Sequence, residues 1–366
     1  MSHFVQLHLL TSYPPANLNR DDLGRPKTAV MGGSPRLRVS SQSLKRAWRT
    51  SDLFTSALAG HVGTRTKAMG VKVFEALLNK GAAEKKAMEW ARAIAGVFGK
   101  LKTLSKKDKD SLKDLDDETR RKKQMTELEI EQLAHFTPEE QQAIDHLVAE
   151  LAERGEGPTA DELKLLRKDH TAADIALFGR MLAADPVFNT EAAAQVAHAI
   201  SVHRVTVEDD FFTAVDDLNA GEEDMGAGHM GETEFAAGLF YLYVCIDREL
   251  LKGNLGGDQT LADKALAALV ECAATVAPTG KQNSFASRAR ASYLLCERGD
   301  QQPRSLSVAF LKPVEGGDML AQAIEQLDEA VANMDKVYGP CADKRCSMNA
   351  VTAEGSLADV IACATA

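Results

Sequence analysis

Aromatic residues are scarce in this sequence, with 13 Phe, 5 Tyr and 2 Trp among 366 residues. The aromatic motif of base-stacking RNA readers, Lys/Arg-Gly-Phe/Tyr-Gly/Ala-Phe-Val-x-Phe/Tyr, is absent. A Walker loop and a glycine-rich dinucleotide fingerprint are absent as well. The sequence therefore gives no support for three functions: recognition of RNA bases by stacked aromatic side chains, nucleotide hydrolysis, and dinucleotide binding.

The first ten residues lack a basic region and a long apolar run, so they predict neither a signal peptide nor a membrane anchor. We expect a cytoplasmic protein with no membrane partner. The six cysteines are too scattered for a disulfide framework and are expected to be reduced thiols. Cys341 and Cys346 have no His or second Cys pair at zinc-ligand spacing nearby, so no metal site and no cofactor are predicted.

The net charge of −10 is unevenly distributed along the chain. Between Arg20 and Arg49, eight basic residues stand against two acidic ones, so this segment carries +6 and the remainder −16. Because the Debye length is about 8 Å at physiological salt, distant charges are screened while a local patch still acts on bound phosphate. An acidic protein can therefore bind RNA locally.

The amino-terminal third begins with a predicted strand. Residues 3 to 11 show the spacing of two that is typical of a strand half-buried in a sheet. Residues 11 to 35 hold several Pro and Gly residues and predict a long loop, which at this length is usually functional. Ser40 then begins a predicted helix.

Residues 60 to 181 show helical patterns and predict an inserted helical domain. Thr137 and Thr171 each precede an acidic residue by three positions, as helix N-caps do. The lysine-rich and acid-rich stretch from 100 to 121 has few apolar residues and predicts a solvated face.

Residues 195 to 207 are ambiguous between a helix end and a strand, and the β-branched residues from 200 to 207 favour a strand. Residues 208 to 234 hold ten acidic residues and no Lys or Arg, with several Gly, which predicts a protruding arm or hairpin. Residues 235 to 246 are almost entirely apolar and predict a strand buried on both faces.

The carboxy-terminal part predicts two helices, at 258 to 277 and 318 to 337, and two strands, at 289 to 297 and 305 to 311. The compact part of the chain then runs strand, helix, strand, strand, helix, strand around the inserted helical domain. This order predicts an α+β fold with a ferredoxin-like split motif, the topology of the RNA recognition module.

The predicted helix after Ser40 has the chemistry that suits a phosphate. Leu44 and Trp48 share a packing face, whereas Lys45 and Arg49 share a cationic one. The helix N-terminus adds unpaired N–H groups and partial positive charge. A Ser-capped surface helix with solvated cations explains the pattern equally well.

Two loops could assist this helix. Arg20 and Lys27 lie in the preceding loop, where they could follow a nucleic-acid strand or serve solubility alone. Residues 277 to 288 form a polar loop around Lys281, which could close over such a strand, although a plain connection to the next strand is slightly favoured.

An enzyme would draw on the acidic arm, because clustered carboxylates such as Glu208, Asp209 and Asp210 can bind hard cations as nucleases do. These residues fit no calcium-loop motif, and neighbouring side chains on an extended chain point to opposite faces. A solvated acidic arm is therefore favoured. His203 could act as a general base, but the sequence shows no Ser or Cys partner for it.

Several segments resemble the CasC family, the backbone subunit of the type I-E CRISPR Cascade complex. The resemblance covers most of the chain outside the helical insertion and rests on these segments: Arg20–Lys27, Arg36–Arg49, Val196–His203, Val207–Asp217, Gly226–His229 and Pro278–Ser284.

The resemblance implies a hand-like subunit with an RRM-like palm, helical fingers and a thumb. The implied domains are palm at 1–59, 182–202 and 235–366, fingers at 60–181 and thumb at 203–234. The residues implied to bind the guide backbone are Arg20, Lys27, Ser40, Gln42, Lys45, Arg46, Arg49, Lys281 and Asn283. Those implied to shape the thumb and its contact with a neighbouring copy are Val202, His203, Val205, Phe211 and Phe212.

The resemblance also implies partners and the absence of catalysis. The partners would be CRISPR guide RNA, neighbouring copies of the chain, the other Cascade subunits (CasA, CasB, CasD and CasE) and, through the guide, target DNA. Backbone subunits of the type I-E branch bind RNA without cutting it. Those of some other CRISPR types cut target RNA with an acidic loop, and a metal-dependent RNA-cleaving subunit is the alternative.

Overall fold

The computed structural model describes residues 3–105, 116–214 and 229–366. The chain divides into two compact units. Unit 1 comprises residues 1–57, 194–248 and 263–366, and unit 2 comprises residues 58–193 and 249–262. The finer boundaries implied for palm, fingers and thumb stay predictions. None of the helices in the described part of the chain is long and apolar enough to cross a membrane.

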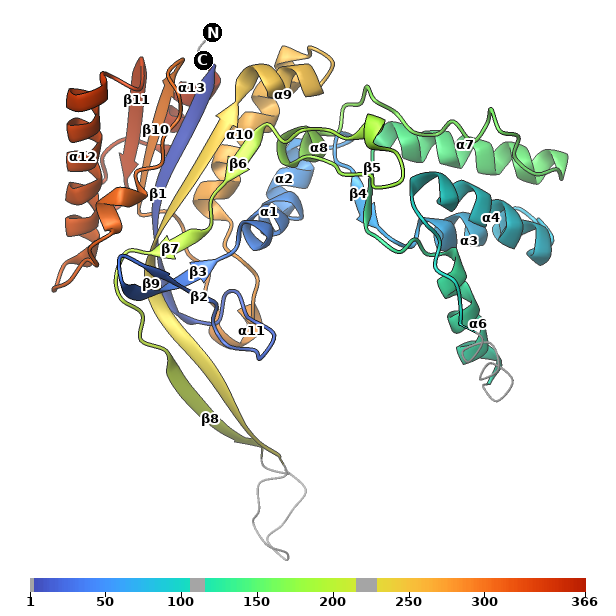
Figure 1. The fold of residues 1–366 in the computed structure, drawn as a ribbon, viewed down its shortest axis with the longest axis horizontal. Helices are drawn as coiled ribbons and strands as arrows, with labels where there is room; N and C mark the ends of the chain where they lie inside the picture. The colour runs from blue at the N-terminus through green and yellow to red at the C-terminus, as the bar shows by residue number, and fades with distance from the viewer. Residues whose placement is uncertain (1–2, 106–115, 215–228) are drawn as a thin grey trace, which may run out of the picture. The chain divides into compact units, whose positions relative to one another are not determined.

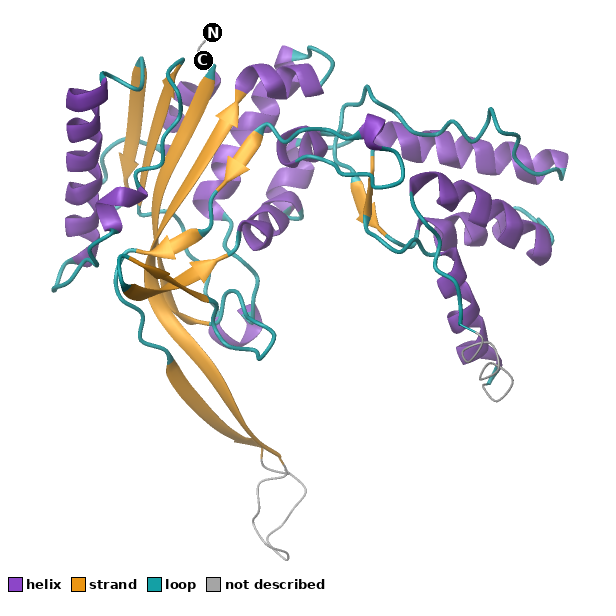
Figure 2. Cartoon of the chain, in the orientation of Figure 1, coloured by secondary structure: helices purple, strands orange, loops and turns teal. Residues whose placement is uncertain are grey.

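Unit 1 is built on an antiparallel sheet (Figures 1 and 2). The sheet order is β11 (Lys344–Asn349), β10 (Tyr293–Gly299), β1 (Phe4–Ala16), β9 (His229–Asp247), β7 (Ala199–Ser201), β3 (Ser34–Val39) and β2 (Thr28–Met31). Two further strands, β6 (Ala194–Val196) and β8 (Glu208–Ala214), also pair with β9.

Strand β1 lies at the centre, where Leu7 pairs with Cys296 of β10 and Val244 of β9. Its side chains alternate between two covered faces, and Val5, Leu7 and Leu9 are fully buried. The predicted first strand is confirmed and continues to residue 16. The predicted buried strand at 235 to 246 is confirmed within β9.

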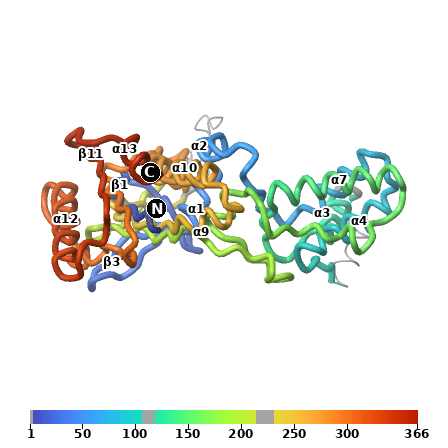
Figure 3. Tube along the Cα trace, turned by 90° about the horizontal axis from the view of Figure 1, so that it is seen from above, coloured from blue at the N-terminus to red at the C-terminus, as the bar shows by residue number. Residues whose placement is uncertain are grey.

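The helices of unit 1 lie on both faces of the sheet. They are α1 (Ser41–Arg49), α2 (Asp52–Ala57), α10 (Gln259–Thr275), which belongs to unit 1 from Asp263 on, α11 (Gln282–Phe285), α12 (Met319–Tyr338) and α13 (Leu357–Thr365). Helix α9 (Arg248–Asn254) belongs to unit 2 except for Arg248. Leu327 and Val331 of α12 share a buried cluster with Leu10 and Tyr241. On the other face, α1 and α10 pack near Leu242 of β9, and Figures 1 and 3 show strands between α12 and α10.

This arrangement confirms the predicted α+β class and the helices predicted at 258 to 277 and 318 to 337. The predicted strand at 305 to 311 is wrong, because residues Ser307–Phe310 form a 3₁₀ helix, η4. The turn carries Leu306 and Phe310 into the core beneath α12, and the Leu306 amide donates to the Tyr241 hydroxyl at 3.0 Å.

The prediction of one long loop at 11 to 35 is also wrong. Strand β1 runs to residue 16, and β2 and β3 form a hairpin. Gly32 and Gly33 make its two-residue turn with φ of 58° and 75°, a conformation that glycine adopts without strain. The true loop is residues 17–27.

The strand expected at 200 to 207 ends earlier, with β7 at Ser201. The Val202 amide still donates to the Leu239 carbonyl of β9, whereas the Val205 amide donates to the Pro35 carbonyl. Strand β8 then pairs with β9 from Glu208 opposite Phe235 to Ala214 opposite His229. The predicted arm is thus a β-hairpin in its described part.

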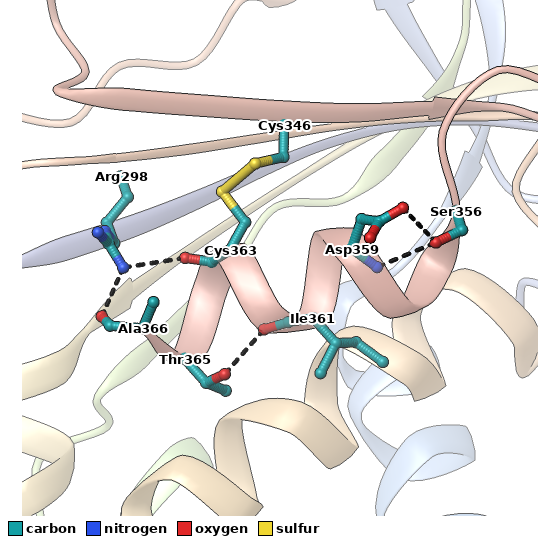
Figure 4. The surroundings of a disulfide bond; sticks show 8 residues. All are labelled: Arg298, Cys346, Ser356, Asp359, Ile361, Cys363, Thr365 and Ala366. Carbon is teal, nitrogen blue, oxygen red and sulfur yellow. Dashed lines mark hydrogen bonds between the residues drawn. A yellow bond between two sulfur atoms is a disulfide. The ribbon is translucent and has the colours of Figure 1, made fainter.

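The expectation that all cysteines are reduced is wrong, because Cys346 of β11 forms a disulfide with Cys363 of α13 (Figure 4). The two residues are 17 positions apart, and only the packing of α13 on β11 brings their Cα atoms within 6.4 Å. Arg298 donates to the Cys363 carbonyl at 3.1 Å and holds the same helix. Cys245, Cys272, Cys296 and Cys341 are free and buried.

Unit 2 is mainly helical. Its helices are α3 (Met69–Asn79), α4 (Glu84–Phe98), α6 (Asp117–Met125), α7 (Pro138–Arg154) and α8 (Ala173–Phe178), with short 3₁₀ turns at Thr126–Leu128 and Pro186–Phe188. Strands β4 (Thr64–Thr66) and β5 (Ala134–Phe136) form a small second sheet. The core includes Phe74, Trp90, Ile94 and Leu151. Residues 106–115 of the predicted solvated face lie outside the described residues.

The N-cap predicted at Thr137 is confirmed as a full capping box with Glu140. The N-cap predicted at Thr171 is wrong, since α8 begins at Ala173 without a side-chain cap. Asp174 instead accepts from the Gly63 amide at 2.8 Å and contacts His135 at 2.7 Å. The acidic residue three positions after Thr171 therefore stabilises tertiary contacts.

Candidate nucleic-acid interface

Helix α1 follows directly from strand β3. Ser40 is its N-cap, and the Ser40 hydroxyl accepts from the Ser43 amide at 3.4 Å. Leu44 and Trp48 are buried, as their spacing predicts. The opposite side of the helix is therefore left to its polar and cationic residues.

The cations of α1 differ in their environment. Gln42 and Arg46 are exposed, whereas Lys45 and Arg49 are half-buried. Burial lowers the pKa of Lys45. A phosphate beside a partly desolvated ammonium interacts more strongly than one beside a fully solvated ammonium.

Loop 17–27 is held in place by its own polar side chains. The Asn17 amide group donates to the Gly24 and Glu234 carbonyls, each at 2.9 Å. Arg20 is exposed and bridges to Pro26, and Lys27 is half-buried. The Ser40 amide donates to Asn19 Oδ1 at 2.9 Å, so the loop also contacts the start of α1.

The loop at 277–288 lies against loop 17–27. A Cβ on Gly280 would come within 2.2 Å of the Leu18 carbonyl oxygen, so the two backbones are in direct contact. Lys281 donates to the Thr233 hydroxyl at 3.1 Å, and the Phe285 ring lies 6.0 Å from that of Phe235. Asn283 is exposed in α11. Three segments that are distant in sequence therefore meet at the base of the hairpin.

The hairpin exposes aromatic side chains. Phe211 is 61% exposed and Phe212 is 41% exposed. Phe212 lies opposite Gly231, where a Cβ would approach its ring to 2.5 Å, so glycine leaves room for the ring. The hairpin therefore offers apolar contacts outside the core of its own chain.

The other residues assigned to a neighbour contact lie at the base of the hairpin. Val202 and Val205 are buried. His203 accepts from the Leu239 amide through Nε2 at 3.1 Å and donates through Nδ1 to the Arg204 carbonyl at 2.8 Å. Both ring nitrogens of His203 are thus engaged in holding the hairpin base.

Arg36 does not contribute to the surface charge counted between Arg20 and Arg49. Its side chain is fully buried and donates to the carbonyls of Ser201, Phe310 and Leu311 at 2.9 to 3.3 Å. Two positions further on, Arg38 is only half-buried and donates to His198 Nδ1 at 2.9 Å. Sequence reasoning assigned no role to Arg38 or His198, although both fall within the segments that resemble the CasC family.

The sheet face beneath α12 is closed by a buried polar network. The Glu297 carboxylate accepts from His8 Nε2 at 3.1 Å, from Arg345 Nε at 2.7 Å and from Arg304. His8 Nδ1 contacts the Tyr241 hydroxyl at 2.8 Å. Burial lowers the pKa of His8. In an open sheet, bases could stack on this face. Here the face is covered by other side chains of the same chain.

The acidic residues proposed as cation ligands are only partly described. Glu208, Asp209 and Asp210 are consecutive on β8 and exposed, so their side chains alternate between the two faces of the hairpin. The other acidic groups of the arm, at 216–217 and 222–224, lie outside the described residues. Within the described ranges, no three His, Cys, Asp or Glu side chains come together as metal ligands.

An α+β fold with cationic loops gathered at the base of a protruding hairpin defines a candidate RNA-binding protein. The chain belongs to the Cas family described as CT1975-like protein, whose model matches residues 5–363. No curated protein matches the chain.

Two solved structures are similar to nearly the whole chain. One is a chain of a "CRISPR RNA-guided surveillance complex, pre-nicking", 29% identical, with a TM-score of 0.81 over 99% of this chain and 100% of that one. The other is a chain of a "CRISPR RNA-guided surveillance complex", 27% identical, with a TM-score of 0.58 over 98% of this chain and 92% of that one.

Proposed function

We propose that this chain is a backbone subunit of a Cascade-type CRISPR surveillance complex and binds the guide RNA. The observation that carries the proposal is the meeting of α1, loop 17–27 and loop 277–288 at the hairpin base. The full-length similarity to chains of CRISPR RNA-guided complexes supports it. The finer assignment to type I-E rests on the resemblance to the CasC family.

In this proposal the sheet of unit 1 is the RRM-like palm, unit 2 the fingers and the β8–β9 hairpin the thumb. Support comes from the strand order β10, β1, β9 and β6/β7, with α1 and α10 on one face. The sheet face under α12 is covered by other parts of the protein, so RNA bases cannot stack on it. This favours binding through the RNA backbone.

We also infer that copies of the chain assemble along the guide through Phe211 and Phe212. Exposed apolar side chains on a protruding hairpin suit a head-to-tail contact between identical subunits. We propose that the chain also contacts other Cascade subunits and, through the guide, target DNA, and that it acts in the cytoplasm.

The guide-binding assignment is tested by reversing charge on α1. Lys45→Glu with Arg49→Glu should abolish co-purification with guide RNA, because both substitutions place a carboxylate beside the phosphates. The matched control is Lys312→Glu with Lys336→Glu, which makes the same charge change at exposed positions of unit 1. The ratio of absorbance at 260 and 280 nm reports bound RNA, and full occupancy in the α1 variant would contradict the assignment.

We further propose that the chain binds RNA without cutting it, as opposed to the metal-dependent cleavage of the alternative. The alternation along β8 supports this, because Asp209 lies on the opposite face of the hairpin from Glu208 and Asp210, so the three carboxylates do not face one cation together. The assay incubates the assembled complex with labelled target RNA and Mg²⁺. Cuts at regular intervals, lost on Asp→Asn substitution in the hairpin, would favour the cleaving subunit.

A further inference from the structure

A cationic pair and a histidine meet at the edge where β3 pairs with β7. The register places Arg38 opposite Ile200, two positions from His198, which lies between β6 and β7. Arg38 Nη1 contacts His198 Nδ1 at 2.9 Å, and Arg38 Nε donates to the Thr28 carbonyl at 3.4 Å. Lys27 is adjacent, because its carbonyl accepts from the Arg38 amide at 2.8 Å.

The contact with Arg38 fixes the tautomer of His198. A guanidinium group has donors only, so His198 Nδ1 is the acceptor and carries no hydrogen. The hydrogen of the neutral ring is then on Nε2. Across residues 3–105, 116–214 and 229–366, no acceptor for this N–H is present, and the His198 side chain is exposed. The ring therefore presents a donor to solvent beside two cations.

The charges around His198 are of one sign. Partial desolvation lowers the pKa of His198, and Arg38 and Lys27 lower it further. No carboxylate forms an ion pair with Arg38 or Lys27 among the residues that the structure describes. Buried and half-buried charges are usually paired with a charge of opposite sign. Arg38 and Lys27 have no such partner among the described residues, so this surface suits an external anion.

We propose that Arg38, Lys27 and His198 bind one phosphodiester of the guide RNA. The proposal rests on the proposed function and adds Arg38 and His198 to the binding residues. Arg38 and Lys27 supply charge, while the Nε2–H of His198 donates to a phosphate oxygen. A phosphodiester fits better than a base edge because every group offered is a donor and two of them are cations. A phosphodiester is an anion with acceptors only, whereas a base edge is neutral.

Three substitutions separate these roles. Arg38→Gln removes the charge and keeps a polar side chain. In His198→Asn, the amide oxygen takes the place of Nδ1 and can still accept from Arg38, but the distal donor is lost. In His198→Gln, the amide nitrogen takes the place of Nε2 and restores that donor.

The experiment measures binding of the full-length chain to fluorescein-labelled single-stranded guide RNA by anisotropy at several salt concentrations. Arg38→Gln should weaken binding about tenfold and make the log–log salt slope shallower by about 0.7, because one phosphate contact is lost. His198→Asn should weaken binding about tenfold with the slope unchanged, and His198→Gln should restore most of it. Thermal unfolding midpoints should match the wild type throughout.

Each other outcome has a defined meaning. Wild-type affinity in Arg38→Gln and His198→Asn would overturn this site and leave the proposed function intact, provided that Lys45→Glu with Arg49→Glu still abolishes binding. Weaker binding by Arg38→Gln with an unchanged salt slope would show a structural role and would also overturn the site. Absence of binding by the wild-type chain would overturn the proposed function and the site together.

Discussion

Glu297 is fully buried in β10 and compensates the charges of two arginines. Arg304 and Arg345 both bind its carboxylate, and Arg345 also reaches Asp335 of α12 at 2.7 Å. The carboxylate thus links the central strands to α12. A neutral residue here would leave both guanidinium groups without their buried partner, which costs about 3–5 kcal/mol when an ion pair is broken from one side.

The pH dependence of unit 1 follows from the same carboxylate. Burial raises the pKa of Glu297, but hydrogen bonds from His8 and Arg304 outweigh burial and hold the pKa below its usual range. The folded state therefore has the lower pKa, and the stabilisation is complete above the unfolded value of about 4.3 and is lost as pH falls below it.

We expect Glu297→Gln to lower the free energy of unfolding at pH 7 by about 3 kcal/mol and to flatten its decline between pH 5 and 3. Urea unfolding followed by Trp48 fluorescence, in a Trp90→Phe background, reports on unit 1 alone, because these are the two tryptophans of the chain. Glu329→Gln, at an exposed position of α12, is the control. An unchanged pH profile in Glu297→Gln would contradict the assignment.

Some of the site could be predicted residue by residue, and some could not. The helical spacing of Leu44 and Trp48 was sufficient to place the cationic side of α1 correctly. Arg36 and Arg38 are two positions apart on β3, the spacing of residues on one face of a strand. Arg36 is nevertheless buried, with its side chain donating to the carbonyl of Phe310, 274 positions away. Local sequence does not show which of two such arginines a distant segment covers.

At the scale of elements, long periodic segments were predicted well and short ones poorly. Helix α12 and strand β9 carry continuous signals over many residues. The 3₁₀ helix η4 and the start of α8 are set by single tertiary contacts, such as the bond of Leu306 to Tyr241. A pattern of a few residues cannot record such a contact.

The disulfide between Cys346 and Cys363 joins an edge strand to the last described helix. It closes a loop with a sequence separation of 17, for which the loss of unfolded-state entropy gives about 3 kcal/mol. We expect Cys363→Ser to lower the free energy of unfolding of unit 1 by about that amount, measured by Trp48 fluorescence in urea. Dithiothreitol should lower the wild-type midpoint to the same value.

The variant itself is the control for the reductant, because dithiothreitol should leave Cys363→Ser unchanged. Alkylation of the folded wild type without reductant, followed by mass spectrometry, should leave both cysteines unmodified. Rapid labelling of both residues in the folded chain would show that the bond is absent in solution.

At the scale of the whole molecule, the two signs of charge are separated. The chain carries −10 overall, while the segment from Arg20 to Arg49, which includes most of loop 17–27 and all of α1, carries +6. The described hairpin strands are acidic, with Glu208, Asp209 and Asp210 on β8 and Glu232 and Glu234 on β9. This separation favours RNA at the hairpin base and disfavours it along the hairpin strands.

An acidic hairpin with exposed phenylalanines suits a protein surface better than RNA, and this gives the last prediction. We expect Phe211→Ser to leave the free energy of unfolding within about 0.5 kcal/mol of wild type, because a side chain 61% exposed contributes little to its own core. The same change should reduce cooperative assembly of several copies on a long guide RNA, measured by sedimentation velocity.

Val337→Ser is the matched control, since Val337 of α12 is 72% exposed and apolar but lies outside the hairpin. Binding of a single copy to a short RNA should be the same in both variants, because the cations of α1 are untouched. If Phe211→Ser assembled on the long guide as cooperatively as Val337→Ser, the hairpin would not be the contact between copies. The interface would then have to lie on another surface of the chain.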